Sequence, residues 1–458
     1  MMERFEIVEN AIKTMLEDKK YTTARDLLST MNPADIASLI VRLEQRKIPL
    51  LFRLLPKELA AETFVEMENE DQELLIRGFS DNELKEILDE LFVDDAVTLV
   101  EEMPANVVKR ILKHADPEMR KIINQILRYP ENSAGSLMTT EYVSLRPDMT
   151  VGESILRIRR QGVDKETIYT CYVTEGRKLI GLVTVKELLL AESDDVLIRD
   201  IMLTNLICVS THTDQEEVAR MLAKYDFLAL PVVDGENRMV GIVTFDDAID
   251  ILEEEATEDM EIMGGMLPSE KSYLRSSAWE LFKNRIPWLM LLMVTATFTG
   301  MIITAFEGAL AAQVALTAFI PMLMGTGGNS GSQSSVTVIR ALSLGEVRSR
   351  DLPRVIWKEL RTAILCGTVL AVVCFGKILL IDGCLLGNSN ITVLVDGVVC
   401  LALLVTVVTA KLIGAALPLA AKAINLDPAV MASPFITSIV DAVSLLVYFL
   451  FARLLLGV

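Results

Sequence analysis

The sequence predicts a multi-domain protein, in which an acidic all-α superhelical domain is followed by an α/β repeat pair and a bundle of five transmembrane helices. The excess of acidic over basic residues is confined to the first part: residues 1–285 carry 34 basic and 55 acidic side chains, whereas residues 286–458 carry 10 basic and 8 acidic ones. The mean hydropathy is +0.39 although 23% of the residues are charged, so apolar residues must be concentrated in one part of the chain. At 458 residues, the chain is long enough for several domains.

Short amphipathic helices are predicted for residues 1–130. In "MNPADIASLIVRLEQRKIPLLFRLLPKELAAETFVEM", apolar residues recur every three or four positions, and Pro33, Pro49 and Pro56 interrupt the pattern. Helical pairs of this kind usually stack into a superhelix. The pattern alone predicts no function. Further helix starts are expected at Ser80, Asp94 and Pro104.

An internal duplication follows. "CYVTEGRKLIGLVTVKELL" aligns with "PVVDGENRMVGIVTFDDAI", and each copy is typical of a strand, a turn, a second strand and a helix. Both copies contain a G-h-V-T core (h, apolar), at residues 181–184 and 241–244. The pair resembles tandem CBS domains, which we place at residues 131–200 and 201–255. This resemblance implies binding of adenine nucleotides or ions and regulation of a neighbouring module.

The end of the second copy is strongly acidic. Residues 246–261 contain nine Asp and Glu, and no Lys or Arg occurs between Arg238 and Lys271. Such runs are usually solvated helix faces. Here no opposite charge balances the like charges four residues apart, which destabilises a helix unless cations bind. We expect residues 256–284 to form a connecting (plug) helix that leads into a membrane domain over 285–458.

Five apolar stretches are each long enough for the roughly 20 residues that a spanning helix needs. Basic residues crowd the connection between the second and third stretches and are almost absent from the first-to-second and third-to-fourth connections. The positive-inside rule therefore predicts that this connection and the acidic part are cytoplasmic and that the C-terminus is outside. The stretches are 286–306, 312–338, 355–381, 391–419 and 434–456. The basic residues are Arg340, Arg348, Arg350, Arg354, Lys358 and Arg361.

The second stretch contains the polar run "GTGGNSGSQSS". Small residues allow close helix packing, and for Gly325, Gly328 and Gly331 alone packing and pore lining are equally good interpretations. Asn329 and Gln333 favour the second, because amides without partners are costly in hydrocarbon and should face the bundle interior or water.

The last stretch contains Asp441, about two turns into an otherwise apolar span. An intramembrane carboxylate predicts a functional site. A structural ion pair is the alternative, but only Lys377 and Lys411 are available in neighbouring spans, and we expect both near helix ends. Pro434 opens the helix, and Thr437 lies one turn before Asp441 on the same face. One carboxylate with carbonyl and amide oxygens suits a hydrated Mg²⁺.

Several classes of protein are disfavoured. The six cysteines form no CxxC pair and no disulfide framework, in agreement with a cytosolic soluble part. With only His114 and His212, a histidine-rich zinc site and a Ser-His-Asp site are not expected, and Walker A, HExxH and GxSxG motifs are absent, so we predict no enzyme. The acidity argues against nucleic acid and favours cations. The cysteines are Cys171, Cys208, Cys366, Cys374, Cys384 and Cys400.

The whole chain resembles the MgtE family of magnesium channels. The resemblance is carried by "YPENSAGSLMTTEYV" before the repeats, "EEEATEDM", "GTGGNSGSQS" and "LDPAVMASPFITSIVD". It implies a homodimer in the bacterial inner membrane, among lipid, with one Mg²⁺ pore on the two-fold axis and Asp427 near its cytoplasmic mouth. The pore residues that it implies are Asp441, Asn329, Gly325, Gly328 and Thr437.

The resemblance also implies that Mg²⁺ closes its own channel. Acids of the N-domain and of the CBS pair repel one another when Mg²⁺ is scarce, and bound Mg²⁺ bridges them in the closed state. Moving a gate from 1:99 to 99:1 needs about 5.5 kcal/mol of differential binding, which several sites can share. The implied ligands are Asp94 or Asp95, the Gly135 and Ala223 carbonyls, Asp214, Glu216, Asp226, Asp247, Asp250, Glu255, Glu258 and Asp259.

ATP is the second ligand that the resemblance implies, and here the sequence departs from the CBS pattern. The motif G-h-x-T-x-x-D grips ribose hydroxyls through its Asp, but the first copy has Glu187, and Asp247 of the second copy is also wanted for Mg²⁺. Binding and absence of binding therefore both stay open. The expected contacts are Tyr169, Thr184, Lys186, Glu187 and Phe227.

Two alternative functions remain: a CBS-regulated transporter of another divalent cation such as Co²⁺ or Mn²⁺, and a membrane-anchored nucleotide sensor. Oxygen ligands discriminate poorly among divalent cations, which keeps the first open. Asp441 distinguishes the nucleotide sensor from a transporter, because a sensor does not need a carboxylate inside the membrane.

Overall fold

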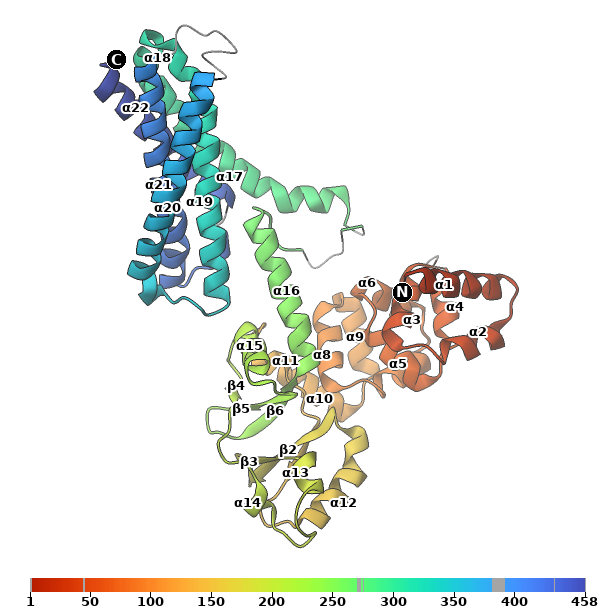
Figure 1. Cartoon of the computed structure of the whole chain (residues 1–458). Coiled ribbons are helices and arrows are strands. Elements are labelled where there is room, and N and C mark those ends of the chain that lie inside the picture. The colour runs from red at the N-terminus through yellow and green to blue at the C-terminus, as the bar shows by residue number, and fades with distance from the viewer. Residues whose placement is uncertain are drawn as a thin grey trace. The chain divides into compact units, whose positions relative to one another are not determined.

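The computed structural model describes residues 2–43, 46–269, 273–274, 276–380, 392–431 and 433–457, and Cys384 lies outside this part of the chain. The described chain divides into two units, Met1–Glu253 and Glu254–Val458. The first contains short helices and two small sheets, and the second contains long helices (Figure 1).

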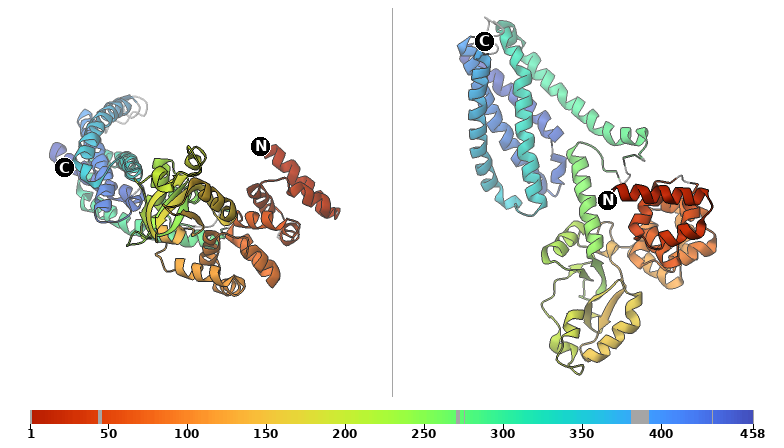
Figure 2. Two further views of the ribbon diagram at one scale, coloured as in Figure 1. Left: turned by 90° about the horizontal axis from the view of Figure 1, so that it is seen from below. Right: turned by 45° about the vertical axis from the view of Figure 1, so that its right-hand side comes forward.

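Ten short helices open the part of the first unit that the structure describes. Helix α3 packs against α5, α5 against α7, and α7 against α9, which is the arrangement of a superhelix (Figure 2). The proline signals are confirmed: Pro33 and Pro49 lie in the first turns of α3 and α4, and Pro56 and Pro104 precede α5 and α9. The helices are α1 (Met2–Glu17), α2 (Tyr21–Leu28), α3 (Pro33–Val41), α4 (Ile48–Phe52), α5 (Lys57–Val65), α6 (Asn69–Gly78), α7 (Asp81–Leu88), α8 (Val93–Glu102), α9 (Ala105–His114) and α10 (Pro117–Ile126).

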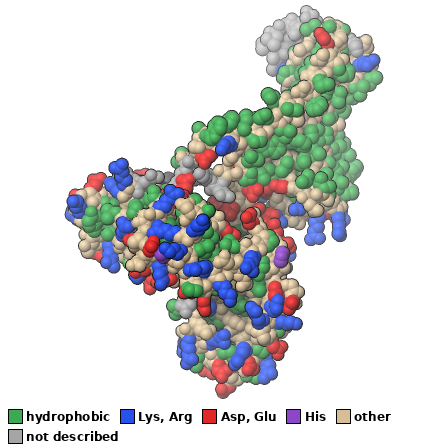
Figure 3. Space-filling model, turned by 180° about the vertical axis from the view of Figure 1, so that it is seen from behind, with side chains coloured by type: hydrophobic (Ala, Val, Ile, Leu, Met, Phe, Trp, Pro, Cys, Tyr) green, Lys and Arg blue, Asp and Glu red, His purple; other side chains and the backbone are tan. Residues whose placement is uncertain are grey.

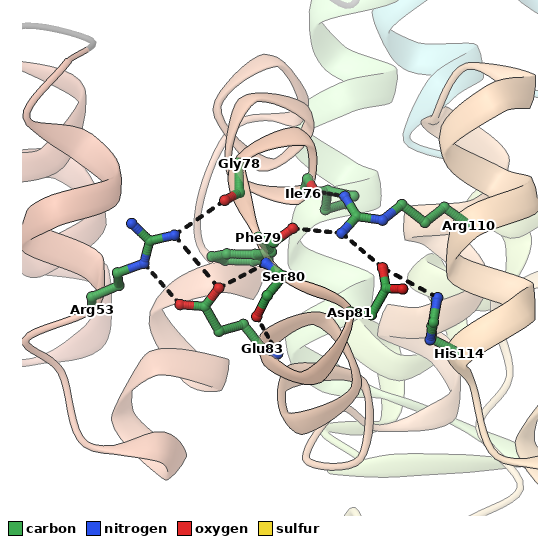
Figure 4. Close-up of polar contacts among 9 residues, drawn as sticks. All are labelled: Arg53, Ile76, Gly78, Phe79, Ser80, Asp81, Glu83, Arg110 and His114. Atoms are coloured by element: carbon green, nitrogen blue, oxygen red, sulfur yellow. Dashed lines mark hydrogen bonds and ion pairs between the residues drawn. The ribbon is translucent and has the colours of Figure 1, made fainter.

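Polar contacts join neighbouring helices of the superhelix (Figure 4). Ser80 caps α7 together with Glu83, as predicted. Arg53 Nε donates to Glu83 Oε1 over 2.8 Å, and this hydrogen bond lowers the pKa of Glu83 to about 2. Arg110 donates to Asp81 Oδ1 over 3.2 Å. The prediction for Asp94 is wrong by two residues, since Phe92 occupies the N-cap of α8 and Asp94 lies in its first turn.

The duplication is confirmed as two sheets of equal topology. In each, a parallel pair is followed by an antiparallel partner, in the orders β1-β2-β3 and β4-β5-β6. The first sheet has β1 (Tyr142–Leu145), β2 (Thr167–Glu175) and β3 (Lys178–Thr184), with α11 (Ala134–Leu137), α12 (Val151–Gln161), η1 (Gly162–Asp164), α13 (Val185–Leu189) and α14 (Ile198–Ile201). The second has β4 (Val209–Ser210), β5 (Ala229–Val233) and β6 (Met239–Thr244), with α15 (Gln215–Tyr225) and α16 (Phe245–Met263).

The glycine of each G-h-V-T core allows another segment to cross its sheet. A Cβ on Gly241 would lie 2.6 Å from the Thr139 carbonyl oxygen, and a Cβ on Gly181 would lie 2.6 Å from Met202 Sδ. The segment before each repeat therefore packs on the sheet of the other repeat, and Thr139 and Leu203 pair with the strands there. This crossing joins the two repeats into one body.

The second repeat and the helical domain share one apolar core. Buried Ile123 and Ile126 of α10 belong to the same cluster as Val209 of β4 and Val218 of α15. The first repeat has its own core, which includes Val143 and Val183. The shared core holds α8 at a fixed place beside the repeats.

The second unit is a helical bundle. Helix α19 packs against α21 and α22, α20 packs against α21, and α17 packs against α22. Apolar side chains cover the outer surface of these helices (Figure 3). The elements are α17 (Ala278–Ala305), α18 (Glu307–Ala312), η2 (Val314–Phe319), α19 (Ile320–Ser343), η3 (Ser349–Asp351), α20 (Leu352–Lys377), α21 (Val393–Ala423), η5 (Pro428–Met431) and α22 (Ser433–Leu456).

Four helical segments of the described chain are long and apolar enough to cross a membrane, rather than the five predicted: Ala278–Ala305, Ser349–Leu380, Val393–Ala423 and Pro428–Leu456. The stretch predicted over 312–338 differs. Its first residues form η2, and α19 begins only at Ile320, with Pro321 in its first turn. The connecting helix predicted over 256–284 is not one continuous helix. Its first residues belong to the end of α16 and its last residues to the start of α17, and Gly265 lies between them at φ +72°.

Candidate functional site

Asp441 lies in the interior of α22 and is half-buried. Its Oδ1 atom is buried, and among the described residues it has no hydrogen-bond partner. The structural ion pair with Lys411 that the sequence left open is not formed, because Lys411 Nζ donates instead to Ser334 Oγ over 3.5 Å. Asp441 is therefore available to a ligand.

The placement of Lys411 corrects a prediction. The residue was expected near a helix end, but α21 extends to Ala423, and Lys411 lies three turns inside it with only 5% of its surface exposed. Lys377 lies in the last turn of α20, as expected.

The glycines of α19 lie at helix crossings. A Cβ on Gly327 would be 2.7 Å from Ser444 Oγ, and one on Gly328 would be 2.9 Å from Thr437 Cγ2. Gly331 faces Ile436 and the Ala410 carbonyl oxygen in the same way. Of the two interpretations that the sequence allowed for Gly328 and Gly331, helix packing and pore lining, these contacts support helix packing. A Cβ on Gly325 would meet no atom of the described residues within 4 Å, so the packing argument does not extend to Gly325.

The amides of α19 line an open pocket of about 860 Å³ between α19, α20 and α21. Asn329 and Gln333 lie on its wall, as expected for amides that avoid hydrocarbon. The structure thus brings Gly328 to Thr437, one turn from Asp441, and places Asn329 on this pocket. The lining residues are Asn329, Ser332, Gln333, Ser334, Val336, Thr337, Glu359, Thr362 and Lys411.

In the first unit, carboxylates from separate elements converge. Burial and the charge of Asp247 raise the pKa of Asp95 to about 7 and hold that of Asp94 well above its usual range. Burial raises the pKa of Asp247 to about 6, although a hydrogen bond from Thr244 Oγ1 opposes the shift. These carboxylates repel one another when ionised, and a cation bound between them would remove this repulsion.

Two further acids, which sequence reasoning missed, join this cluster. Burial and the charge of Asp246 raise the pKa of Glu166 to about 7, and Glu166 Oε2 is buried without a hydrogen-bond partner in the described chain. Glu141 Oε2 accepts from Val93 N over 3.0 Å at the start of α8. Neither acid belongs to an acidic run, so only the fold places them beside Asp95. Within the residues described here, no three metal-ligating side chains form a preformed site.

Another group of predicted ligands surrounds α15. Asp214 caps the helix by accepting from Glu216 N over 3.0 Å, and Asp226 ends it at φ +54°. Ala223 lies on its last turn. Gly135 N donates to the carbonyl oxygen of Thr211, the first residue of the loop between β4 and α15.

The remaining predicted acids lie on α16. Asp250 belongs to the first unit, and burial raises its pKa. In the second unit, burial, then the charges of Glu255 and Asp427, raise the pKa of Glu258. Asp259 lies 3.5 Å from Ser343 Oγ at the end of α19. The end of α16 therefore places acidic side chains beside the C-terminal end of α19.

Three family models match the chain. MgtE, described as a divalent cation transporter, matches residues 320–451; the MgtE intracellular N domain matches 31–132; and the CBS domain matches 134–194 and 198–254. The magnesium transporter MgtE of Thermus thermophilus is 36% identical over 97% of this chain and 98% of its own. The chain belongs to the MgtE family. The magnesium transporter MgtE of Bacillus subtilis is 32% identical, over 95% and 94% of the two chains.

Solved structures of this family match the first part of the chain. The cytosolic domain of the Mg²⁺ channel MgtE in complex with ATP is 36% identical, with a TM-score of 0.51, and the match covers 53% of this chain and 99% of that one. The soluble part of a magnesium transporter is 29% identical, with a TM-score of 0.52, over 55% and 99%. Both confirm the helical domain followed by the CBS pair.

In this MgtE chain, the two CBS motif acids cap helices. Glu187 Oε2 accepts from Thr184 N over 2.8 Å, and Asp247 Oδ2 accepts from Thr244 Oγ1 over 2.5 Å. Tyr169 is exposed, and Phe227 stacks on Tyr225 at 5.5 Å. Lys186 is the second residue of the five-residue helix α13 and precedes Glu187.

Two acids on candidate spanning helices of this MgtE chain were not predicted as site residues from the sequence. Asp396 lies in the first turn of α21 with 1% exposed, and Cys400 Sγ donates to it over 3.3 Å. Glu359 lies on α20 and accepts from Ser334 Oγ over 2.6 Å. Glu359 and Asp396 lie within the predicted third and fourth apolar stretches, so the search for carboxylates in such stretches that identified Asp441 also applies to them.

Proposed function

We propose that the chain is a magnesium transporter in which Asp441 recognises the ion. The observation that carries the proposal is the Asp441 carboxylate, which is half-buried within an apolar helix and has no partner among the described residues. An intramembrane carboxylate is stable there only if it meets a cation or water. Two relatives that are similar over nearly the whole chain are named magnesium transporters.

The ion route runs beside α19, which we propose as a fifth span. Its 24 residues extend about 36 Å, enough to cross a bilayer core of about 30 Å. The hydroxyl and amide side chains of α19 make it less apolar than the four other candidate spans, and these are the groups that a cation route needs. Gly325, Asn329 and Thr437 line the route, and Asp427 stands at its cytoplasmic end.

The protein works as a homodimer in the bacterial inner membrane, with the pore on the two-fold axis. The acidic part and the loop before α20 are cytoplasmic, and the C-terminus is outside, as the basic residues of that loop indicate. A symmetric dimer gives two copies of Asp441 to one ion, which suits a divalent charge.

Magnesium closes its own route through the cytosolic carboxylates. The cluster around Asp95 and Asp247 is buried and mutually repulsive, so its occupancy by Mg²⁺ stabilises contact between α8 and the CBS pair. Both Asp94 and Asp95 contribute, because the charge of Asp247 acts on each. The acids around α15 and on α16 add further weak sites, and α16 conveys the closed arrangement to α19.

ATP binds the CBS pair near Tyr169, Thr184, Lys186, Glu187 and Phe227. A cytosolic domain that is 36% identical was solved in complex with ATP, which supports this assignment. The engagement of Glu187 in a helix cap opposes it, since the carboxylate must leave the cap to reach ribose hydroxyls. Equilibrium dialysis of residues 1–265 that retains no ATP would remove ATP from the account.

Growth of a magnesium-uptake-deficient bacterium tests the transport proposal. The wild-type chain should restore growth at low Mg²⁺, and Asp441→Ala, at equal membrane abundance, should not. Rescue by Asp441→Ala, or uptake of Co²⁺ or Mn²⁺ in place of Mg²⁺, would favour the corresponding alternative.

A further inference from the structure

A hydrogen-bonded chain of three side chains joins α19, α20 and α21. Lys411 Nζ of α21 donates to Ser334 Oγ of α19 over 3.5 Å, and Ser334 Oγ donates to Glu359 Oε2 of α20 over 2.6 Å. Lys411 and Ser334 are 5% and 2% exposed, so the hydroxyl joins two opposite charges at a buried place.

The direction of this chain is fixed by chemistry. An ammonium group only donates, an ionised carboxylate only accepts, and a hydroxyl does both. Ser334 gives its single proton to Glu359 and offers a lone pair to Lys411. Each charge therefore polarises the hydroxyl in the direction that favours its hydrogen bond to the other charge. Removal of Glu359 leaves the buried Lys411 ammonium without compensation, whereas removal of Lys411 leaves a half-buried Glu359 carboxylate without its cation.

The charged pair Glu359 and Lys411 also borders the proposed cation route. Glu359, Ser334 and Lys411 line the same pocket as Asn329 and Gln333. A charge on the wall of this pocket acts on an ion that passes it, and the double charge of a divalent ion doubles the interaction energy. An uncompensated Lys411 would repel a cation from this pocket, whereas an uncompensated Glu359 would hold it.

We propose that Glu359 neutralises Lys411 through Ser334, so that the pocket beside the cation route carries no net charge. The proposal rests on the transport function proposed above. It makes Glu359 and Lys411 positioning residues that set the rate of ion passage, whereas Asp441 recognises the ion. A purely mechanical tie between α19, α20 and α21 is the alternative, and it predicts a different response to paired substitutions.

A double-mutant cycle in the full-length protein separates the two. Mg²⁺ flux into proteoliposomes would be measured over a range of Mg²⁺ for Glu359→Gln, Lys411→Met and the double variant. Glu359→Gln should lower flux at least tenfold and raise the half-saturating Mg²⁺. Lys411→Met should lower the half-saturating Mg²⁺ at least threefold. The double variant should return both quantities to within threefold of the wild type.

Lys358→Met is the matched control, because Lys358 is exposed on α20 beside Glu359, and it should leave flux unchanged. If Glu359→Gln does not accumulate as folded protein, the double variant decides, since charge compensation predicts that it folds and transports. A double variant as defective as the two single variants combined would overturn the proposal. A wild-type protein without Mg²⁺ flux would instead overturn the proposed function.

Discussion

Gly331 of α19 and Gly414 of α21 lie in backbone contact: a Cβ on Gly414 would overlap the Gly331 carbonyl oxygen. This is the closest approach recorded for any described glycine. Lys411 and Ser334 lie one turn away on the same two helices, so the crossing sets the depth at which their side chains meet.

Gly414→Ala should therefore push α19 and α21 apart. Overpacking of this kind costs about 1–3 kcal/mol, and we expect a fall of several degrees in the melting temperature of the detergent-solubilised protein and a loss of most Mg²⁺ flux. Gly397→Ala on the same helix is the control, because a Cβ there meets nothing within 4 Å. Equal stability of the two variants would contradict the observed crossing.

The carboxylate cluster of the first unit predicts a pH-dependent stability. In the folded chain, the pKa values of Asp95 and Glu166 are raised to about 7 and that of Asp247 to about 6, from ordinary values of 3.8 for Asp and 4.5 for Glu. Between pH 4 and 7 the folded state holds more protons, so stability must fall as pH rises through this window. For residues 1–265 without Mg²⁺, we expect a decrease on the order of 2 kcal/mol between pH 5 and pH 8, measured by urea denaturation.

Added Mg²⁺ should oppose this loss. It should stabilise residues 1–265 more at pH 8 than at pH 5, because protons and Mg²⁺ compete for the same oxygens. Asp95→Asn combined with Asp247→Asn should flatten both dependences, whereas Asp195→Asn, an exposed change, should alter neither. A Mg²⁺ effect of equal size at both pH values would argue against binding at this cluster.

Neutralisation of the acids of α16 should remove the closing response. We expect a variant with Asn or Gln at Asp247, Asp250, Glu255, Glu258 and Asp259 to conduct at a level independent of cytoplasmic Mg²⁺. Patch-clamp recording with Mg²⁺ added to the cytoplasmic side measures this. Currents that still close over the wild-type concentration range would exclude α16 as a sensor.

The local pattern of the sequence was sufficient for much of the fold. The repeats were predictable because Gly181 and Gly241 recur in the same strand context, and Asp441 because one carboxylate interrupts an apolar run. The start of α19 was not predictable, since the residues of η2 are as apolar as those of a spanning helix.

Long-range contacts account for what the sequence could not predict. Glu166 and Glu141 are isolated acids, and only the packing of α8 on the repeats places them beside Asp95. Lys411 was expected near a helix end, because the apolar run weakens after residue 419 although the helix continues to Ala423. Its contact with Ser334 depends on the crossing of two helices far apart in sequence.

Mg²⁺ flux through Asp441→Asn tests the central claim most directly, because the substitution keeps the size of the side chain and removes its charge. In proteoliposomes that contain full-length protein, we expect flux at least tenfold below the wild type, with Leu446→Ala, a change at an exposed position of the same helix, close to the wild type. Flux through Asp441→Asn equal to that of the wild type would contradict a role of this carboxylate in recognising the ion.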